Sequence, residues 1–164
     1  MKRVAIPAVV LILAGLAFWW FSPTQVLKRR TAAFIDTARV PVSMSDLGRS
    51  ARGRHLADYF APRIEVESPE NLAHEVGRTF TRDEAAALYS GVARYCREVS
   101  ITDLEFVSVG SKNEEARVVF TADTIVDLPN RRPVDGLVTV ESRWRKIEGD
   151  WLLEAFEWTE SARP

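Results

Sequence analysis

The segment from Pro133 to Glu160 constrains the fold of this chain more than any other. Two long runs of alternating apolar and polar residues flank the tight turn Glu148-Gly149-Asp150. Alternation with a period of two is typical of strands, and a short glycine-containing turn between two such runs predicts a β-hairpin. The hairpin carries three of the five tryptophans of the chain, Trp144, Trp151 and Trp158.

Because side chains alternate between the two faces of a strand, the position of the turn divides the hairpin into two sets. We expect one set to face the core, together with alternate residues of the preceding strand: Val138, Val140, Ser142, Trp144, Trp151, Leu153, Ala155 and Glu157, with Ala116, Val118, Phe120, Ala122 and Thr124. The other set mixes charged and aromatic residues and is expected to face solvent or a partner: Thr139, Glu141, Arg143, Arg145, Leu152, Glu154, Phe156 and Trp158.

An uncharged apolar run, Val4–Phe21, follows Lys2 and Arg3 near the start of the chain. As a helix, its roughly eighteen residues would reach ~27 Å, close to the hydrocarbon thickness of a bilayer. Trp19 and Trp20 stand at its end, where aromatic residues commonly meet lipid headgroups. The run predicts a membrane anchor, with a cleavable signal peptide and a buried helix as the alternatives.

The expected domain organisation follows from this run. Residues 1–22 would form the anchor and residues 23–164 the folded domain of a single-pass protein of a bacterial-type inner (plasma) membrane. The short N-terminal tail favours a domain outside the cytoplasm, in the periplasm, whereas the basic cluster Lys28-Arg29-Arg30 favours the opposite orientation. A solvated helix face near lipid headgroups is the simpler explanation of that cluster.

Helix starts are marked by capping residues in the first half of the chain. Ser22-Pro23-Thr24-Gln25 predicts a helix that runs to about Ala38. The segment from Ser43 to Asp46 predicts a second helix, with Val42 and Leu47 placed as a hydrophobic staple.

A third helix start, Thr81–Glu84, has the pattern of a capping box. One apolar face of that helix follows at helical spacing: Ala85, Leu88, Tyr89, Val92 and Cys96. Cys96 is therefore expected to be a small buried residue rather than a nucleophile. In the second helix, Gly48 and Gly53 are expected to reduce stability by about 1 kcal/mol each relative to alanine.

Further alternating segments predict additional strands at Arg63–Glu67, near His74–Val76, at Ser100–Val109 and at Ala116–Asp127. Four long antiparallel strands thus follow three helices. This order predicts an α+β fold in which the helices cover one face of a curved antiparallel sheet.

Composition excludes several classes of function. The net charge of −1 provides no basic field for nucleic acid. A single cysteine, Cys96, permits no intrachain disulfide, and with two histidines, His55 and His74, it rules out a cysteine- or histidine-rich metal centre. Both histidines are expected to be surface residues, and no cofactor is expected.

The order of elements, with the segments "ADYFAPRIEVESP" and "RWRKIEGDWLLEAFEW", resembles the NTF2-like (SnoaL-like) superfamily over about Lys28–Glu160. The residues that carry the resemblance are Tyr59-Phe60-Ala61, Ile64-Glu65-Val66 and Gly149 to Leu153. The resemblance implies a cone, in which a curved sheet wraps around about three helices. It does not imply one activity, because the superfamily holds ketosteroid isomerase-like and dehydratase-like enzymes, epoxide hydrolases and polyketide cyclases beside non-enzymatic transport and assembly domains.

A ketosteroid isomerase-type site would need a carboxylate base inside an apolar cone and a hydroxyl aimed at the developing oxyanion. Glu157 is the candidate base, and Tyr59 and Tyr89 are the candidate hydroxyl donors. The expected lining of the cone is Phe120, Ser142, Trp144, Leu153 and Ala155. An epoxide hydrolase-type site would instead use Asp123, Glu141 and Arg143, which parity places on the outer face, where an ion-pair lattice is the simpler explanation.

A non-catalytic binding or assembly domain is the function that the sequence favours. The expected interface is the outer sheet face with Arg143, Arg145, Phe156 and Trp158, because arginine and aromatic side chains commonly anchor protein interfaces. A second copy of the chain or another protein would bind there, and a small apolar ligand could occupy the cone.

Overall fold

The computed structural model describes residues 13–67 and 78–161. One six-stranded sheet dominates the structure, in the order β2-β1-β6-β5-β4-β3. Its strands are β1 (Phe60–Glu67), β2 (Arg78–Thr81), β3 (Glu98–Lys112), β4 (Glu115–Asp127), β5 (Val134–Ile147) and β6 (Asp150–Ser161). The predicted hairpin is β5 and β6, and Gly149 in its turn has a positive φ of 97°, which favours glycine.

The sheet is mixed, which differs from the antiparallel sheet expected from the sequence. Strand β1 pairs in parallel with β6, whereas all other neighbouring strands pair antiparallel. The long connection through α4 and β3–β5 brings β1 and β6 together, and alternation within a strand carries no information about such a distant partner. The short strand expected near His74–Val76 lies outside the described residues.

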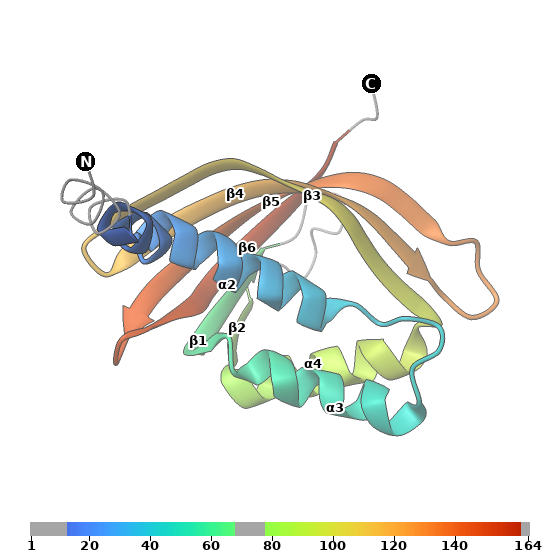
Figure 1. The fold of residues 1–164 in the computed structure, drawn as a ribbon. Helices are drawn as coiled ribbons and strands as arrows, with labels where there is room; N and C mark the ends of the chain where they lie inside the picture. Colours follow the sequence, from blue (N-terminus) through green and yellow to red (C-terminus); the bar gives the residue numbers. More distant parts are fainter. Residues whose placement is uncertain (1–12, 68–77, 162–164) are drawn as a thin grey trace.

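Three helices, α2 (Pro23–Ala38), α3 (Asp46–Ala57) and α4 (Arg82–Tyr95), lie on one side of the curved sheet. Figure 1 shows α2 running beneath the arch of the strands, with α3 and α4 packed side by side farther from the sheet. The α+β class and the helices expected after Ser22 and Thr81 are confirmed.

Helix α2 supplies the centre of the core because its apolar face recurs at helical spacing. Four residues of that face are buried: Leu27, Thr31, Ile35 and Ala38. Beyond the helix, Val40 forms an isolated bridge with Val99 of β3, and both backbone N–H groups donate across it. This bridge ties the end of α2 to the edge of the sheet.

Local chemistry explains the starts of the other two helices. The capping box of α4 is present: the Thr81 hydroxyl accepts from the Glu84 N–H, and the Glu84 carboxylate accepts from the Thr81 N–H. Helix α3 is capped by Ser45, whose Oγ accepts from Gly48, rather than by Ser43. The staple expected with Leu47 is wrong, because Leu47 is 81% exposed.

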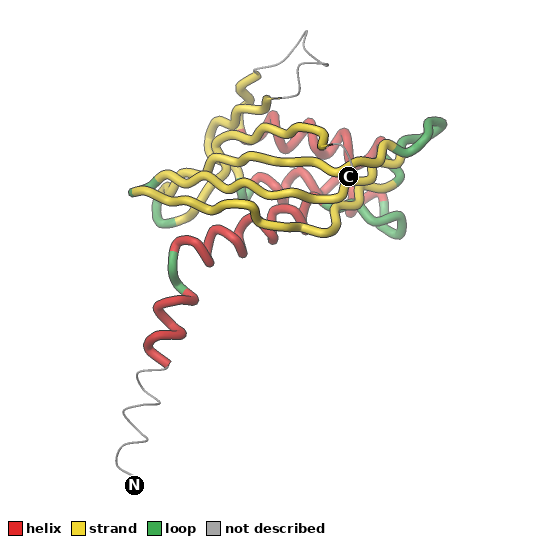
Figure 2. Tube along the Cα trace, turned by 90° about the horizontal axis from the view of Figure 1, so that it is seen from above, coloured by secondary structure: helices red, strands yellow, loops and turns green. Residues whose placement is uncertain are grey.

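The segment before α2 is helical over residues 13–20 and extends away from the sheet (Figure 2). Its large apolar residues are more than half exposed: Leu13, Leu16, Phe18, Trp19, Trp20 and Phe21. Within residues 13–67 and 78–161, no helix has the length and apolar character needed to cross a bilayer. Residues 4–12 of the expected span lie outside the described part of the chain.

The basic cluster at the start of α2 is not simply a solvated face. The Arg29 guanidinium lies 4.3 Å from the centroid of the Trp20 ring and donates to the Trp20 carbonyl. Arg30 lies over Tyr59 and donates to the carbonyls of Asp58 and Trp151. These contacts fix α2 to the segment before it and to the β1 side of the sheet.

Candidate functional site

The concave face of the sheet is built from rows of residues paired across β5 and β6. From the base upward, Trp144 pairs with Leu153, Ser142 with Phe156, Val140 with Trp158, and Val138 with Glu160. Strand β4 continues these rows with Ala116, Val118, Phe120 and Ala122. Paired residues share a face, so each row presents its side chains to α2.

The rows reveal a β-bulge that alternation alone does not show. Trp144 pairs with Leu153, but its neighbour Arg143 pairs with Ala155, so Glu154 has no counterpart in β5. An extra residue reverses the inside–outside parity of everything that follows it in the strand. The expectation that Glu157 faces the core is therefore wrong, and Ala155, although only 5% exposed, borders the outer side of β6 rather than the pocket.

The same bulge turns Phe156 and Trp158 inward, which overturns their expected place on the outer face. Both line the pocket described below. The sequence did contain a signal for this reversal. The apolar residues Trp151, Leu153 and Ala155 occupy odd positions, whereas the aromatic residues Phe156 and Trp158 occupy even positions. Such a switch within one strand is typical of a bulge.

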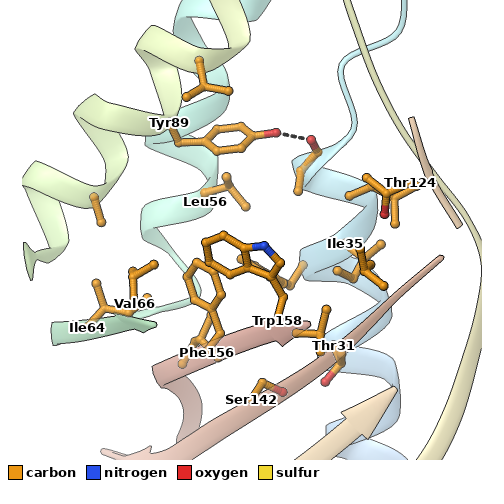
Figure 3. Close-up of a pocket in the computed structure, with 18 of the residues that line it drawn as sticks. Thr31, Ile35, Leu56, Ile64, Val66, Tyr89, Thr124, Ser142, Phe156 and Trp158 are labelled. Carbon is orange, nitrogen blue, oxygen red and sulfur yellow. Dashed lines mark hydrogen bonds between the residues drawn. The ribbon is translucent and has the colours of Figure 1, made fainter. Parts of the chain in front are cut away.

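A pocket of about 620 Å³ lies between the concave sheet face, α2 and α4. This volume is in the range of small-molecule sites, which are commonly 300–1,000 Å³. Figure 3 shows its wall, with Phe156 and Trp158 standing between the β1 side and α2. Trp144, Ser142, Phe120 and Leu153 belong to the lining, whereas Ala155 does not.

The lining is apolar at its base and on the helix side. Trp144, Phe120 and Leu153 are nearly inaccessible to solvent. Leu88 and Val92 of α4 also line the pocket but are about half exposed, which places them at the mouth. A ligand could therefore bury an apolar body against the base while its other end stays near solvent.

Two polar side chains in the pocket already have partners within the protein. The Ser142 hydroxyl donates to the Val118 carbonyl over 3.1 Å and accepts from Trp144 Nε1 over 3.0 Å. The Tyr89 hydroxyl donates to the Ala38 carbonyl (Figure 3). Burial of the phenol raises the pKa of Tyr89 to about 12. Tyr89 therefore stays a neutral donor committed to the backbone at physiological pH.

Thr31 is the exception among the buried polar groups of the lining. It is fully buried on α2, and its hydroxyl has no hydrogen-bond partner among the described residues. Figure 3 places it at the base of the pocket, near Ser142. An unpaired buried hydroxyl is uncommon because it loses water without gaining a replacement.

Carboxylates reach the pocket at its mouth. Glu160 belongs to the Val138 row of the inner face, and Asp135 lies at the start of β5; both are exposed. Neither residue was among the site residues expected from the sequence. Because the parity assigned to β6 was wrong beyond Glu154, Glu160 could not be placed inside from the sequence.

Comparison with known proteins identifies the fold. No protein-family model and no curated protein sequence matches the chain. Among solved structures, a ketosteroid isomerase-like protein from Erwinia carotovora atroseptica superposes with a TM-score of 0.65 at 12% identity, over 87% of this chain and 99% of that one. A candidate dehydratase of the NTF2-like family from Streptomyces avermitilis superposes with a TM-score of 0.61 at 13% identity, over 85% and 96% of the two chains. The fold is NTF2-like.

A further solved structure agrees in architecture. A candidate scytalone dehydratase from Novosphingobium aromaticivorans has a TM-score of 0.62 at 18% identity, with 84% of this chain and 83% of that one covered. Identities of this size establish the shared fold alone, so the site residues must be judged from their own positions.

The isomerase-type constellation is not assembled in this NTF2-like cone. Glu157 lies on the outer face, where it borders a shallow hollow of about 240 Å³ with Glu67, Glu141 and Arg143. Tyr59 does not line the main pocket; it packs edge-on against Phe34 beneath the Arg30 guanidinium. Of the three candidates, only Tyr89 reaches the pocket, and its hydroxyl is engaged with the backbone.

The epoxide hydrolase-type set is likewise separated. Glu141 pairs with Arg117, and Arg143 pairs with Glu65. Asp123 aligns with Leu137, four residues along β5 from Glu141, or ~13 Å away at strand spacing. Arg145 pairs with Glu154 at 2.9 Å. The outer face is thus an ion-pair lattice.

Two further observations concern metal and thiol chemistry. Within the described ranges, no group of three His, Cys, Asp or Glu residues could hold a metal ion. Cys96 is 4% exposed, as expected for a small core residue, and burial raises the pKa of its thiol. His55 is exposed, and His74 lies outside the described residues.

Proposed function

We propose that this NTF2-like domain binds an apolar small molecule in its concave pocket and does not transform it chemically. The observation that carries the proposal is the pocket itself: about 620 Å³, open at one end and lined predominantly by aliphatic and aromatic side chains. An apolar pocket of this size is the usual form of a small-molecule site.

The distribution of ionisable groups supports binding over catalysis. An isomerase- or dehydratase-type reaction needs an acid or base held against the reacting carbon in a protected site. In the described part of the lining, the carboxylates are Glu160 and Asp135, and both are exposed at the mouth. The names of the neighbouring structures suggest enzymes, but they belong to proteins that share 18% identity or less with this chain.

Protein assembly through the outer sheet face has weaker support. Its two expected aromatic anchors, Phe156 and Trp158, line the pocket instead. Arg143 and Arg145 remain outside but are paired with Glu65 and Glu154. Exposed ion pairs contribute little free energy, so we do not extend the proposal to a dimer through this face.

Membrane attachment is a separate part of the proposal. The exposed apolar helix at residues 13–20 ends in Trp19 and Trp20, and Arg29 stacks on Trp20. Aromatic and basic residues together are typical of the interfacial zone of a bilayer. We expect the full chain to sediment with membranes and residues 23–164 to remain in the supernatant, and a topology reporter fused after Pro164 would identify the side. Equal partitioning of both forms would refute the anchor.

Binding can be tested with the neutral fluorescent probe N-phenyl-1-naphthylamine. We expect saturable binding with a blue-shifted emission at one site per chain. Val138→Trp should abolish it by filling the pocket, because Val138 stands in an inner row. Val119→Trp is the matched control, since Val119 pairs with Glu141 on the outer face of β4. Absent binding, or equal loss in both variants, would overturn the proposal.

A further inference from the structure

We propose that the ligand of this pocket is a cationic amphiphile: an apolar chain that lies in the pocket and a protonated amine held at the mouth by Glu160 and the Phe156–Trp158 pair. This inference rests on the proposed function, because it names the ligand class of the same pocket. It is carried by the charge of the lining, by the order of residues along β6 and by the geometry of the aromatic pair.

The charge of the lining has one sign. No lysine, arginine or histidine is present among the described residues that line the pocket, and Glu160 gives its mouth a negative charge. Arg52 of α3 is close enough to Tyr89 to influence the pKa of its hydroxyl, but it is not part of the lining. A bound carboxylate or phosphate would face this charge without a counter-ion, whereas an ammonium group would find one.

Strand β6 places the Glu160 carboxylate next to the Trp158 ring on the same face of the sheet. Trp158 pairs with Val140 and Glu160 pairs with Val138, so the two side chains are successive members of one face. Residues i and i+2 of a strand are ~7 Å apart. A single ammonium group can therefore contact the face of one ring and the carboxylate of the next residue in the row.

The aromatic surface suits a cation. Phe156 and Trp158 stack with their ring centroids 5.7 Å apart and their planes 27° from parallel. Indole is the most favourable ring for a cation–π contact, and a cation within about 6 Å of its centroid is attracted by it. Within the described residues the Trp158 ring has no cation of its own, unlike Trp20, over which Arg29 lies.

The rest of the pocket accounts for the apolar chain. Phe120 and Val140 stand in the same row as Trp158, and the rows below it carry Ser142 and Trp144, without a charged group among the described lining residues of these rows. A straight alkyl chain would run from the mouth along these rows toward α2. The two ends of the pocket thus specify opposite ends of one amphiphile.

Three ligands with one chain length and different headgroups test the inference. Dodecylammonium, dodecanol and dodecanoate, each below its micellar concentration, would compete with N-phenyl-1-naphthylamine for the full chain. We expect the amine to bind about two- to fivefold more tightly than the alcohol, as for a partly exposed ion pair. It should bind on the order of tenfold more tightly than the carboxylate, which Glu160 repels.

Two variants with the same change in net charge separate the local effect from the general field. Glu160→Gln should reduce the preference for amine over alcohol by about twofold or more, which leaves only the contribution of the Trp158 ring. Glu157→Gln should leave the preference unchanged, because Glu157 faces the opposite side of β6. Trp158→Leu should reduce the same ratio about twofold or more through loss of the cation–π contact. Both carboxylates are exposed, so neither substitution is expected to affect folding.

The outcomes distinguish this inference from the proposed function. Tighter binding of dodecanoate, equal affinities for all three headgroups, or an amine preference that Glu160→Gln leaves unchanged would overturn the cationic ligand class while leaving apolar binding intact. Failure of every ligand, and of the probe, to bind would overturn the proposed function itself.

Discussion

Gly53 of α3 lies so close to the carbonyl oxygen of Ala86 in α4 that a Cβ on Gly53 would come within 1.8 Å of it. From sequence alone this glycine is a weak point in a helix. In the folded protein it is the position that allows α3 and α4 to approach each other, and α4 in turn forms one wall of the pocket.

Gly53→Ala should therefore destabilise the domain by about 1–3 kcal/mol or more, because the two helices must separate to accommodate the methyl group. Gly91→Ala is the matched control: Gly91 lies in α4 with nothing within 4 Å of an added Cβ, so the better helix propensity of alanine should stabilise by up to ~1 kcal/mol. Urea unfolding of both variants measures the difference. Similar effects of the two substitutions would contradict the close approach.

Arg49 should be the most sensitive polar residue outside the pocket. It is 8% exposed, and its guanidinium donates to backbone carbonyls rather than to a carboxylate. The acceptors are Pro41, Val42, Met44, Ala93, Cys96 and Arg97. It joins the segment before α3 to the C-terminal end of α4, where a cation also interacts favourably with the helix dipole.

Arg49→Met should lower the free energy of unfolding by about 3 kcal/mol or more, because several buried carbonyls lose their donor. Arg49→Lys should recover only part of this loss, since an ammonium group cannot span the same set of acceptors. Arg54→Met on the exposed side of α3 should change stability by no more than about 0.5 kcal/mol. Chemical denaturation would show whether the three variants follow this order.

The hydroxyl of Thr31 should be dispensable for folding. Because this hydroxyl is buried without a partner among the described residues, Thr31→Val should stabilise the domain by about 1 kcal/mol. Ser142→Ala should act in the opposite direction by a similar amount, since it removes a hydroxyl that satisfies both the Val118 carbonyl and the Trp144 N–H. Thermal unfolding of the two variants measures these opposite changes in stability. A destabilised Thr31→Val variant would show that the hydroxyl has a partner in solution.

Tyr89 should titrate well above the usual range of a tyrosine. Its pKa in the folded state is about 12, whereas the pKa of a tyrosine in an unfolded chain is about 10. The folded state holds the phenolic proton more tightly, so the stabilisation is fully present below pH ~10 and is lost as the pH rises toward 12. The ultraviolet absorbance of tyrosinate measures the deprotonation of Tyr89 directly.

The high-pH step in that titration should disappear in Tyr89→Phe and persist in Tyr95→Phe, because Tyr95 is 59% exposed. If Tyr95→Phe removed the step instead, the buried hydrogen bond from Tyr89 to Ala38 would not be the cause.

Interactions close in sequence explain which features were predictable. The capping box of Thr81 and Glu84, the alternation of β4 and β5, and the glycine turn at Gly149 depend on residues a few positions apart, and each is present in the structure. The α+β class follows from the order of such elements.

The identity of the side chains that line the pocket depended on pairing between residues far apart in the sequence. Glu154 becomes an extra residue only because Trp144 pairs with Leu153 while Arg143 pairs with Ala155. That register is chosen by packing across the sheet, which also brings β1 alongside β6 in parallel. One unmatched residue was enough to exchange Glu157 for Trp158 at the wall of the cone.

The sequence by itself therefore determined the elements, their order and the apolar character of one sheet face, because periodicity and capping act over a few residues. Only the tertiary structure decided which side chains of β6 enter the pocket. The physical reason is that a strand has a period of two, so a single bulge set by distant partners reverses the facing of every residue beyond it.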